Sequence, residues 1–167
     1  NVIQGTGRSL HVWAALDGSK YMGLGTETKV YIEEGGAYND ITPIRATTTL
    51  GANPLTTVNG SRVVTVTAPA HGAVTNDFVT ISGATAVNSI TAAQLNTEHQ
   101  ITVIDSNSYT IPTAGSAGSG TLTGGGSSVV AAYQINTGLN TVVSGTGFGA
   151  GLWGGYSTGY AQTTLND

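Results

Sequence analysis

The sequence predicts an all-β fold built of antiparallel strands. Three segments place Val and Ile on one face and mostly Thr, Ser or Gln on the other, namely Val63–Thr67, Phe78–Ser82 and Gln100–Ile104. This period of two is typical of half-buried strands. Charged residues make up only 8 % of the chain, against about 25 % in an average globular domain. The polar positions are instead Thr, Ser, Asn and Gly, a mixture that favours β-sheet with many tight turns.

The N-terminal residues 9–49 predict an antiparallel meander. Its expected strands are Ser9–Leu16, Lys29–Glu33 and Ala37–Thr42. The first of them ends at Asp17-Gly18, a strong turn pair. The other two flank Glu34-Gly35-Gly36, which indicates a hairpin with a short Gly-rich loop. Pro43 follows at a point where a strand end tolerates it.

The central stretch Arg62–Pro112 predicts a self-contained β unit with turns between its strands. Two of these turns are Ala70-His71-Gly72 and Asp105-Ser106-Asn107, whose residue types favour tight turns. The one expected helix lies at Ile90–Asn96. There Thr91, followed by Gln94 three residues on, resembles a capping box.

Two stretches beside this unit predict little structure of their own. Residues 50–61 are expected to form a connector, and residues 113–128 a flexible loop or linker because their composition is of low complexity. Strand character returns at Val129–Ile135.

Composition excludes several classes of partner. The net charge is −4 and the five Lys and Arg residues are scattered, so we expect no nucleic-acid footprint. No apolar run approaches the roughly 18 residues of a membrane-spanning helix.

The chain has no Cys, and hence neither a disulfide framework nor a thiolate metal site. Because it begins at Asn1 without an initiator Met or signal peptide, we expect a processed product or a piece of a longer polypeptide.

Part of the central unit is similar to a known module. His71-Gly72 follows an alternating strand, Asp77–Gly83 reads DFVTISG, and Gln100–Ile111 reads QITVIDSNSYTI. This pattern resembles a small β-barrel module that recurs in phage and prophage tail proteins and is labelled as similar to the first catalytic-cysteine half-domain (FCCH) fold of ubiquitin-activating enzymes. The resemblance implies a barrel fold without ubiquitin chemistry.

The flanking residues carry a second resemblance. Trp13–Thr26 reads WAALDGSKYMGLGT and Val30–Arg45 reads VYIEEGGAYNDITPIR. These stretches are similar to phage tail structural proteins, and within them to the tail nozzle or tail tubular proteins of short-tailed phages. In that family, similar strands belong to a propeller-like body into which β modules are inserted.

Together the resemblances imply a small β-barrel module inserted between flanking β segments. The expected division is an N-terminal flank at residues 1–58, the FCCH-like module at 59–125 and a C-terminal flank with a Gly/aromatic-rich tail at 126–167. They also imply a non-catalytic structural protein of the phage tail, located in the virion, that forms a symmetric ring or tube of its own copies and contacts other virion proteins. No catalytic residue, cofactor or metal is expected.

Several motifs could carry chemistry, and each has a simpler structural interpretation. Gly149–Gly154 matches G-x-G-x-x-G, but no helix-forming sequence follows it, so we expect no nucleotide binding. The adjacent Glu33 and Glu34 would point to opposite faces of a strand and therefore solvate a turn. We expect turns rather than calcium ligands at Asp17-Gly18 and at Asp105.

The three histidines are far apart in the sequence and do not have the spacing of a zinc site. His71 is expected to cap or pack in its turn, and His99, beside Glu98, to be exposed. An enzyme such as a depolymerase would need distant carboxylates to converge, for example Asp40, Asp77 and Asp105.

Aromatic residues supply the candidate binding surface. Phe148, Trp153, Tyr156 and Tyr160 alternate with Gly near the C-terminus, and we expect them to form an interface between subunits. The alternative is a surface adhesin or carbohydrate-binding module that contacts host surface glycans, for which Trp13, Tyr31 and Tyr38 could also contribute. Trp13 lies in a predicted strand and is expected in the core.

Overall fold

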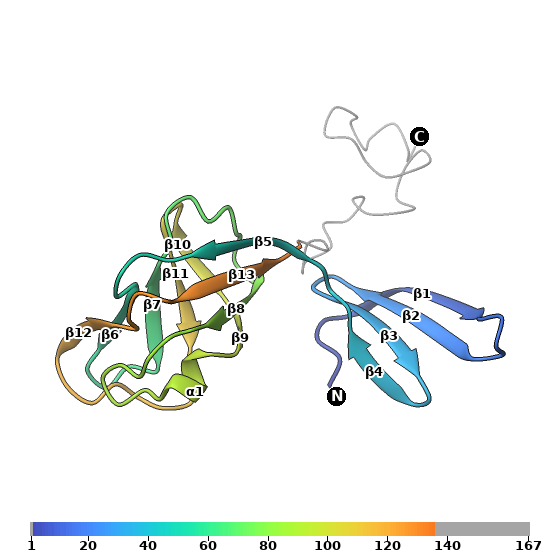
Figure 1. The fold of residues 1–167 in the computed structure, drawn as a ribbon, viewed down its shortest axis with the longest axis horizontal. Helices are drawn as coiled ribbons and strands as arrows, with labels where there is room; N and C mark the ends of the chain where they lie inside the picture. Colours follow the sequence, from blue (N-terminus) through green and yellow to red (C-terminus); the bar gives the residue numbers. More distant parts are fainter. Residues whose placement is uncertain (1, 136–167) are drawn as a thin grey trace, which may run out of the picture. The chain divides into compact units, whose positions relative to one another are not determined.

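The structure is a computed structural model, and it describes residues 2–135. These residues fall within one compact unit, Asn1–Thr137. Antiparallel strands dominate it (Figure 1), and one short helix is present among the described residues. The predicted all-β, antiparallel fold class is therefore confirmed.

The first four strands form a meander of their own. They are β1 (Gly7–Ala14), β2 (Lys20–Thr26), β3 (Val30–Glu34) and β4 (Ala37–Asp40). They pair in sequence order, with β1 and β4 at the two edges. The predicted meander is confirmed as far as β4, although β2 was not among its expected strands. The chain then leaves this sheet after Pro43.

Two turns set the register of the meander. Gly35 and Gly36 have φ angles of 59° and 88°, so the two-residue loop between β3 and β4 uses the left-handed conformation that hairpin turns require. Between β1 and β2, the Asp17 carboxylate accepts a hydrogen bond from the Ser19 backbone N–H. Both predicted turns are confirmed.

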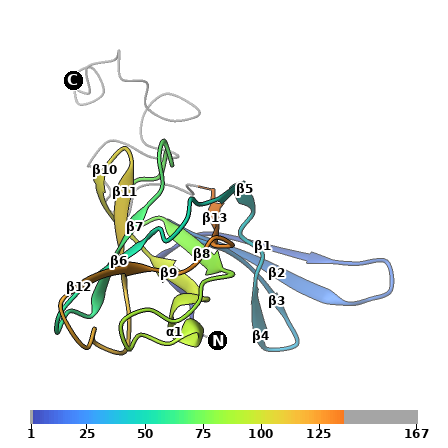
Figure 2. The same cartoon turned by 60° about the vertical axis from the view of Figure 1, so that its left-hand side comes forward.

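The remaining strands form two further sheets. One has the order β5-β13-β8-β9, and the other β10-β11-β7-β6-β12 (Figure 1, Figure 2). Their bounds are β5 (Ile44–Thr49), β6 (Leu55–Val58), β7 (Val63–Thr67), β8 (Phe78–Ser82), β9 (Glu98–Gln100), β10 (Thr102–Asp105), β11 (Ser108–Pro112), β12 (Thr121–Gly124) and β13 (Val130–Gln134).

Both sheets contribute their inner faces to one hydrophobic core. Val64 and Ile111 come from one sheet, and Val79 and Ala131 from the other. Each of these four side chains is 0 % exposed. The alternation of apolar and polar residues along the strands thus follows from packing on one face only.

The predicted barrel is not formed, because neither of the two sheets closes on itself. The predicted strand Gln100–Ile104 explains how they are joined. It is interrupted at the buried Ile101. The backbone of this residue forms hydrogen bonds with the backbone of Asn76 and Asp77, which belong to no strand. Residues before it pair with β8 and residues after it with β11. The chain therefore changes sheet at this corner, and the core lies between two open sheets.

The predictions of a connector at residues 50–61 and of a flexible linker at residues 113–128 are wrong. Residues 50–61 contain β6, and residues 113–128 contain β12, which pairs with β6. The linker also packs against the core at Ala117, which is 3 % exposed. The Ala117 backbone forms hydrogen bonds with the backbone of Gly60 and of Ser61. Tertiary pairing across more than 60 residues overrides the flexible composition.

The helix prediction is confirmed as α1 (Ala92–Leu95), a single short turn. The Thr91 hydroxyl accepts a hydrogen bond from the Gln94 N–H at 3.4 Å, as an N-cap should. The reciprocal half of the capping box is absent here, because the Gln94 Oε1 atom is buried without a hydrogen-bond partner.

The division of the chain at 58/59 and 125/126 remains a prediction. The core takes in Leu50, Leu55 and Val129 as well as the residues between 59 and 125. The predicted strand at Val129–Ile135 is confirmed as β13, which lies between β5 and β8 in its sheet.

Candidate functional site

The β1–β2 hairpin exposes apolar side chains that a folded chain would normally bury. Leu10 and Val12 are each 63 % exposed, and Leu16 is fully exposed. All eight residues of β1 are exposed. Because β1 is an edge strand, no other strand of the described residues pairs with its outer side. This hairpin is therefore a candidate contact surface.

Three rings form a row on the opposite face of the hairpin. The rings of His11 and Trp13 are stacked 5.8 Å apart, and those of Trp13 and Tyr21 are 5.7 Å apart. The Trp13 ring covers Gly23, whose position leaves space for it on the neighbouring strand. The prediction that Trp13 lies in the core is wrong, since 37 % of it is exposed. Stacking against its neighbours stabilises it at the surface.

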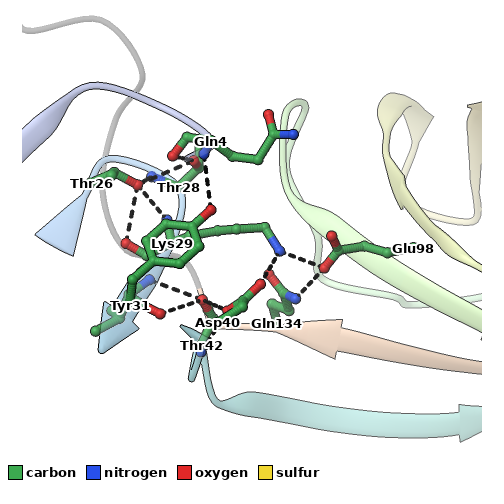
Figure 3. A network of polar contacts seen from close by, with 10 residues as sticks. Gln4, Thr26, Thr28, Lys29, Tyr31, Asp40, Thr42, Glu98 and Gln134 are labelled. Atoms are coloured by element: carbon green, nitrogen blue, oxygen red, sulfur yellow. Dashed lines mark hydrogen bonds and ion pairs between the residues drawn. The ribbon is translucent and has the colours of Figure 1, made fainter. Parts of the chain in front are cut away.

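A second polar site is centred on Lys29, which is 1 % exposed. A turn from Thr26 positions it, because the Lys29 N–H donates to the Thr26 hydroxyl at 2.8 Å. Its Nζ atom forms ion pairs with Asp40 and with Glu98, the latter at 2.6 Å (Figure 3). The same Nζ atom lies 4.5 Å from the centre of the Phe78 ring.

This network joins two sheets. Lys29 and Asp40 belong to the β1–β4 region, whereas Glu98 begins β9 in the second sheet. Gln134, from β13, donates its side-chain N–H to the same Glu98 carboxylate. No pattern in the sequence indicated this site, because Lys29 and Glu98 are 69 residues apart.

The contacts in the network shift the pKa values of Lys29 and Asp40. Burial acts to lower the pKa of Lys29, but hydrogen bonds and charge from Asp40 and Glu98 outweigh it, so the pKa is raised. Burial likewise acts to raise the pKa of Asp40. Hydrogen bonds from Lys29 and Thr42 prevail, and this pKa is lowered. Each member therefore keeps the other charged.

His71 forms the polar centre of the core. Its Nδ1 atom accepts a hydrogen bond from the Ala73 N–H at 3.0 Å, which leaves Nε2 to donate to the Asp105 carbonyl at 2.9 Å. Its ring meets the Tyr109 ring edge-on at 5.2 Å and is stacked with the Tyr133 ring at 6.4 Å. The prediction that His71 caps or packs in its turn is confirmed.

The prediction that His99 is exposed is wrong. His99 is 6 % exposed, and its Nε2 atom lies 3.0 Å from the Leu95 carbonyl at the end of α1. The alternation of β9 turns the side chain inward, while its neighbour Glu98 reaches Lys29.

The candidate carboxylates are each engaged within their own surroundings. Asp77 accepts a hydrogen bond from the Val74 N–H, and Asp105 from the Asn107 N–H and the Ser108 hydroxyl. Asp40 is held by Lys29 and Thr42. Glu33 accepts a hydrogen bond from the Gly36 N–H, as expected of a turn residue. Within residues 2–135, no group of three acidic or His side chains could hold a metal ion.

The C-terminal candidates lie outside the described residues. This applies to the Gly149–Gly154 motif and to the predicted surface of Phe148, Trp153, Tyr156 and Tyr160. Of the other aromatic residues considered for a glycan platform, Tyr31 is buried and Tyr38 is half-buried. Trp13 alone among the described three is exposed. No helix in the described part of the chain is long and apolar enough to cross a membrane.

Comparison with known proteins leaves the family open. No family model matches the chain, and no curated protein matches it. Among solved structures, the chain is similar to phage phi92 endosialidase, with 15 % sequence identity and a TM-score of 0.44. The match covers 74 % of this chain but only 18 % of that one. A similarity at this level assigns neither a family nor a function.

Proposed function

We propose that the protein is a non-catalytic structural component of a phage tail, which acts as a symmetric assembly of its own copies within the virion. The sequence stretches Trp13–Thr26 and Val30–Arg45, which resemble tail proteins, supply most of the β1–β4 meander, and the second stretch ends in β5. The same meander carries the exposed contact surface. Other virion proteins are the further partners that this role requires.

The exposed β1–β2 hairpin is the observation that supports this proposal. Apolar side chains such as Leu10 and Val12 lose favourable burial when they face water, by about 25 cal/mol for each Å². Large apolar side chains exposed together on one strand are typical of interaction sites. In an assembly of copies, this surface of one copy would be buried against another copy.

The oligomeric state of the full chain tests the proposal. We expect native mass spectrometry and sedimentation velocity to show a symmetric multimer whose population rises with concentration. A strictly monomeric species at all accessible concentrations would contradict it.

A second candidate function is a surface adhesin that binds glycans. The observation that favours it is the exposed row of His11, Trp13 and Tyr21, because aromatic faces stack on sugar rings. Glycan binding by the full chain would then be lost in Trp13→Ala. The matched control is Leu10→Ala, which removes an exposed apolar side chain from the other face of the same strand. If Trp13→Ala binds glycans as the wild type does, this candidate fails.

A further inference from the structure

The outer edge of β1 lacks the devices that usually prevent strands from pairing. Edge strands are normally kept short, or carry Pro, inward-pointing charges or bulges. With eight residues, β1 is the longest strand among the described residues. It contains no Pro, and its one register shift lies at its start, between Gly7 and Ser9. From Ser9 to Ala14 it carries no charged side chain.

The other edge of the same sheet is protected. β4 has four residues and ends at Asp40, which is held in the Lys29 network. Most other edge strands of the described chain are also short, with three residues in β9 and four each in β10 and β12. The contrast singles out β1 as the edge that is open to a partner strand.

The residues of β1 that face this partner follow from the hairpin geometry. The Ala15 N–H donates to the Ser19 carbonyl at 2.8 Å, so Ala15 directs its backbone groups toward β2. Backbone direction alternates along an antiparallel strand. Leu10, Val12 and Ala14 therefore direct their N–H and C=O groups outward.

We propose that β1 pairs in an antiparallel arrangement with β1 of a second copy, about a two-fold axis at Val12. The two four-stranded sheets then form one continuous sheet. This inference rests on the proposed self-assembly and names the surface that performs it. The contact is isologous, so that the same strand serves both copies and the edge is closed.

Side-chain complementarity supports the axis at Val12. In this register Val12 lies opposite Val12 of the second copy, and Leu10 lies opposite its Ala14. On the other face, Trp13 lies opposite His11 of the second copy, which extends the aromatic row across the boundary. Cross-strand aromatic and apolar pairs of this kind stabilise sheets.

Charge is complementary in the same register. Arg8 lies at the register shift at the start of β1, and Leu16 and Asp17 lie in the turn that follows it. Antiparallel pairing brings the start of one strand to the end of the other, and so brings Arg8 of each copy to the end that carries Asp17 of the other. The fully exposed Leu16 then gains a neighbour. No like charges lie directly opposite each other along the paired strands, because Arg8 is the only charged residue of β1.

The variant Val12→Pro tests the pairing without removing a bond of the folded chain. Proline removes the outward N–H and is tolerated on edge strands, so the sheet of each copy should survive. We expect the full-length variant to sediment as a monomer at concentrations where the wild type is associated, with an unchanged circular dichroism spectrum. The matched control, Val12→Thr, keeps the N–H and should associate as the wild type does.

A cysteine at the axis supplies a second readout, because the chain has no native Cys. Opposed residues of a hydrogen-bonded pair have Cα atoms about 5.5 Å apart, within the range of a disulfide. Val12→Cys should therefore form a disulfide-linked dimer on mild oxidation, whereas Asn39→Cys on β4 should not.

The outcomes separate this inference from the proposed function. Association of Val12→Pro at wild-type strength, or equal crosslinking of the two Cys variants, would overturn pairing through β1 and leave self-assembly intact. A wild type that stays monomeric would overturn both. A third outcome is that the wild type associates only with a different virion protein and that Val12→Pro loses this association. The strand paired with β1 would then belong to that protein, and pairing between copies would be overturned.

Discussion

At the residue scale, the buried polar side chains each require a partner inside the core. His71, Tyr109 and Tyr133 lie inside an otherwise apolar core, and each has a partner. The Tyr109 and Tyr133 hydroxyls lie 3.4 Å apart, and the Arg45 guanidinium lies 5.1 Å from the centre of the Tyr133 ring. The sequence indicated the turn at His71. It could not indicate the tyrosine pair, because those residues meet only when two sheets pack together.

Alkaline pH should destabilise the fold through these phenols. Burial, with added contributions from Tyr133, raises the pKa of Tyr109 above its ordinary 10.0. Burial also raises the pKa of Tyr133, although Tyr109 and Arg45 oppose it. Above pH 10 the unfolded chain loses these protons while the folded chain keeps them, so the free energy of unfolding falls as pH rises.

Urea denaturation between pH 8 and 11, approximate limits set by the ordinary tyrosine pKa, measures this effect. Tyr109→Phe removes one titrating group and should lose less stability across this range than the wild type. At neutral pH the variant should be less stable by about 1 kcal/mol, because the Tyr133 hydroxyl loses its partner. Equal slopes against pH for the two proteins would contradict the account.

Local pattern and long-range pairing contribute differently at the element scale. The bounds of β7 and β8 agree with prediction, because alternation is visible within each segment. β6 and β12 were missed, because each is only four residues long and lies in a Gly-, Pro- or Ser-rich context. Each is defined by pairing with the other. The exposure of the β1–β2 hairpin was likewise not predicted, because Trp13 lies in a predicted strand and was expected in the core.

The turn after β8 requires glycine at position 83, and this requirement can be tested by substitution. Gly83 directly follows β8 with a φ of 72°, and a Cβ atom placed there would lie 2.1 Å from the Ser128 carbonyl oxygen. Gly83→Ala should therefore lower the free energy of unfolding by about 2 kcal/mol or more, since the left-handed conformation alone costs about 1–2 kcal/mol. Thermal denaturation checks this value.

Gly51→Ala is the matched control for that experiment. No atom lies within 4 Å of a Cβ placed at Gly51, and its φ does not require glycine. We expect a change of about 0.5 kcal/mol or less. If the two variants lost the same stability, the steric argument at Gly83 would fail.

The Lys29 network is the clearest link between sheets at the scale of the whole molecule. It joins Lys29, just before β3, and Asp40 in β4 to β9 and β13 through side chains, a relation that composition and periodicity cannot reveal. The division into two flanks and an inserted module stays a prediction. The core and this network draw on residues from all three of those segments.

Acid should weaken this link. The pKa of Asp40 is lowered from 3.8 because hydrogen bonds from Lys29 and Thr42 outweigh the effect of burial. Its contribution to stability is present above the unfolded pKa and is lost as pH falls through the folded pKa. Asp40→Asn should therefore flatten the pH dependence of unfolding below about pH 4, as measured by urea denaturation from pH 5 downward. An unchanged profile would contradict a charged Asp40 in the network.

Sedimentation of the wild type beside Val12→Pro decides whether the exposed edge of β1 assembles copies of this chain. We expect an associated wild type and a folded, monomeric variant at the same concentration. A variant that remains associated to the same extent as the wild type would contradict this expectation.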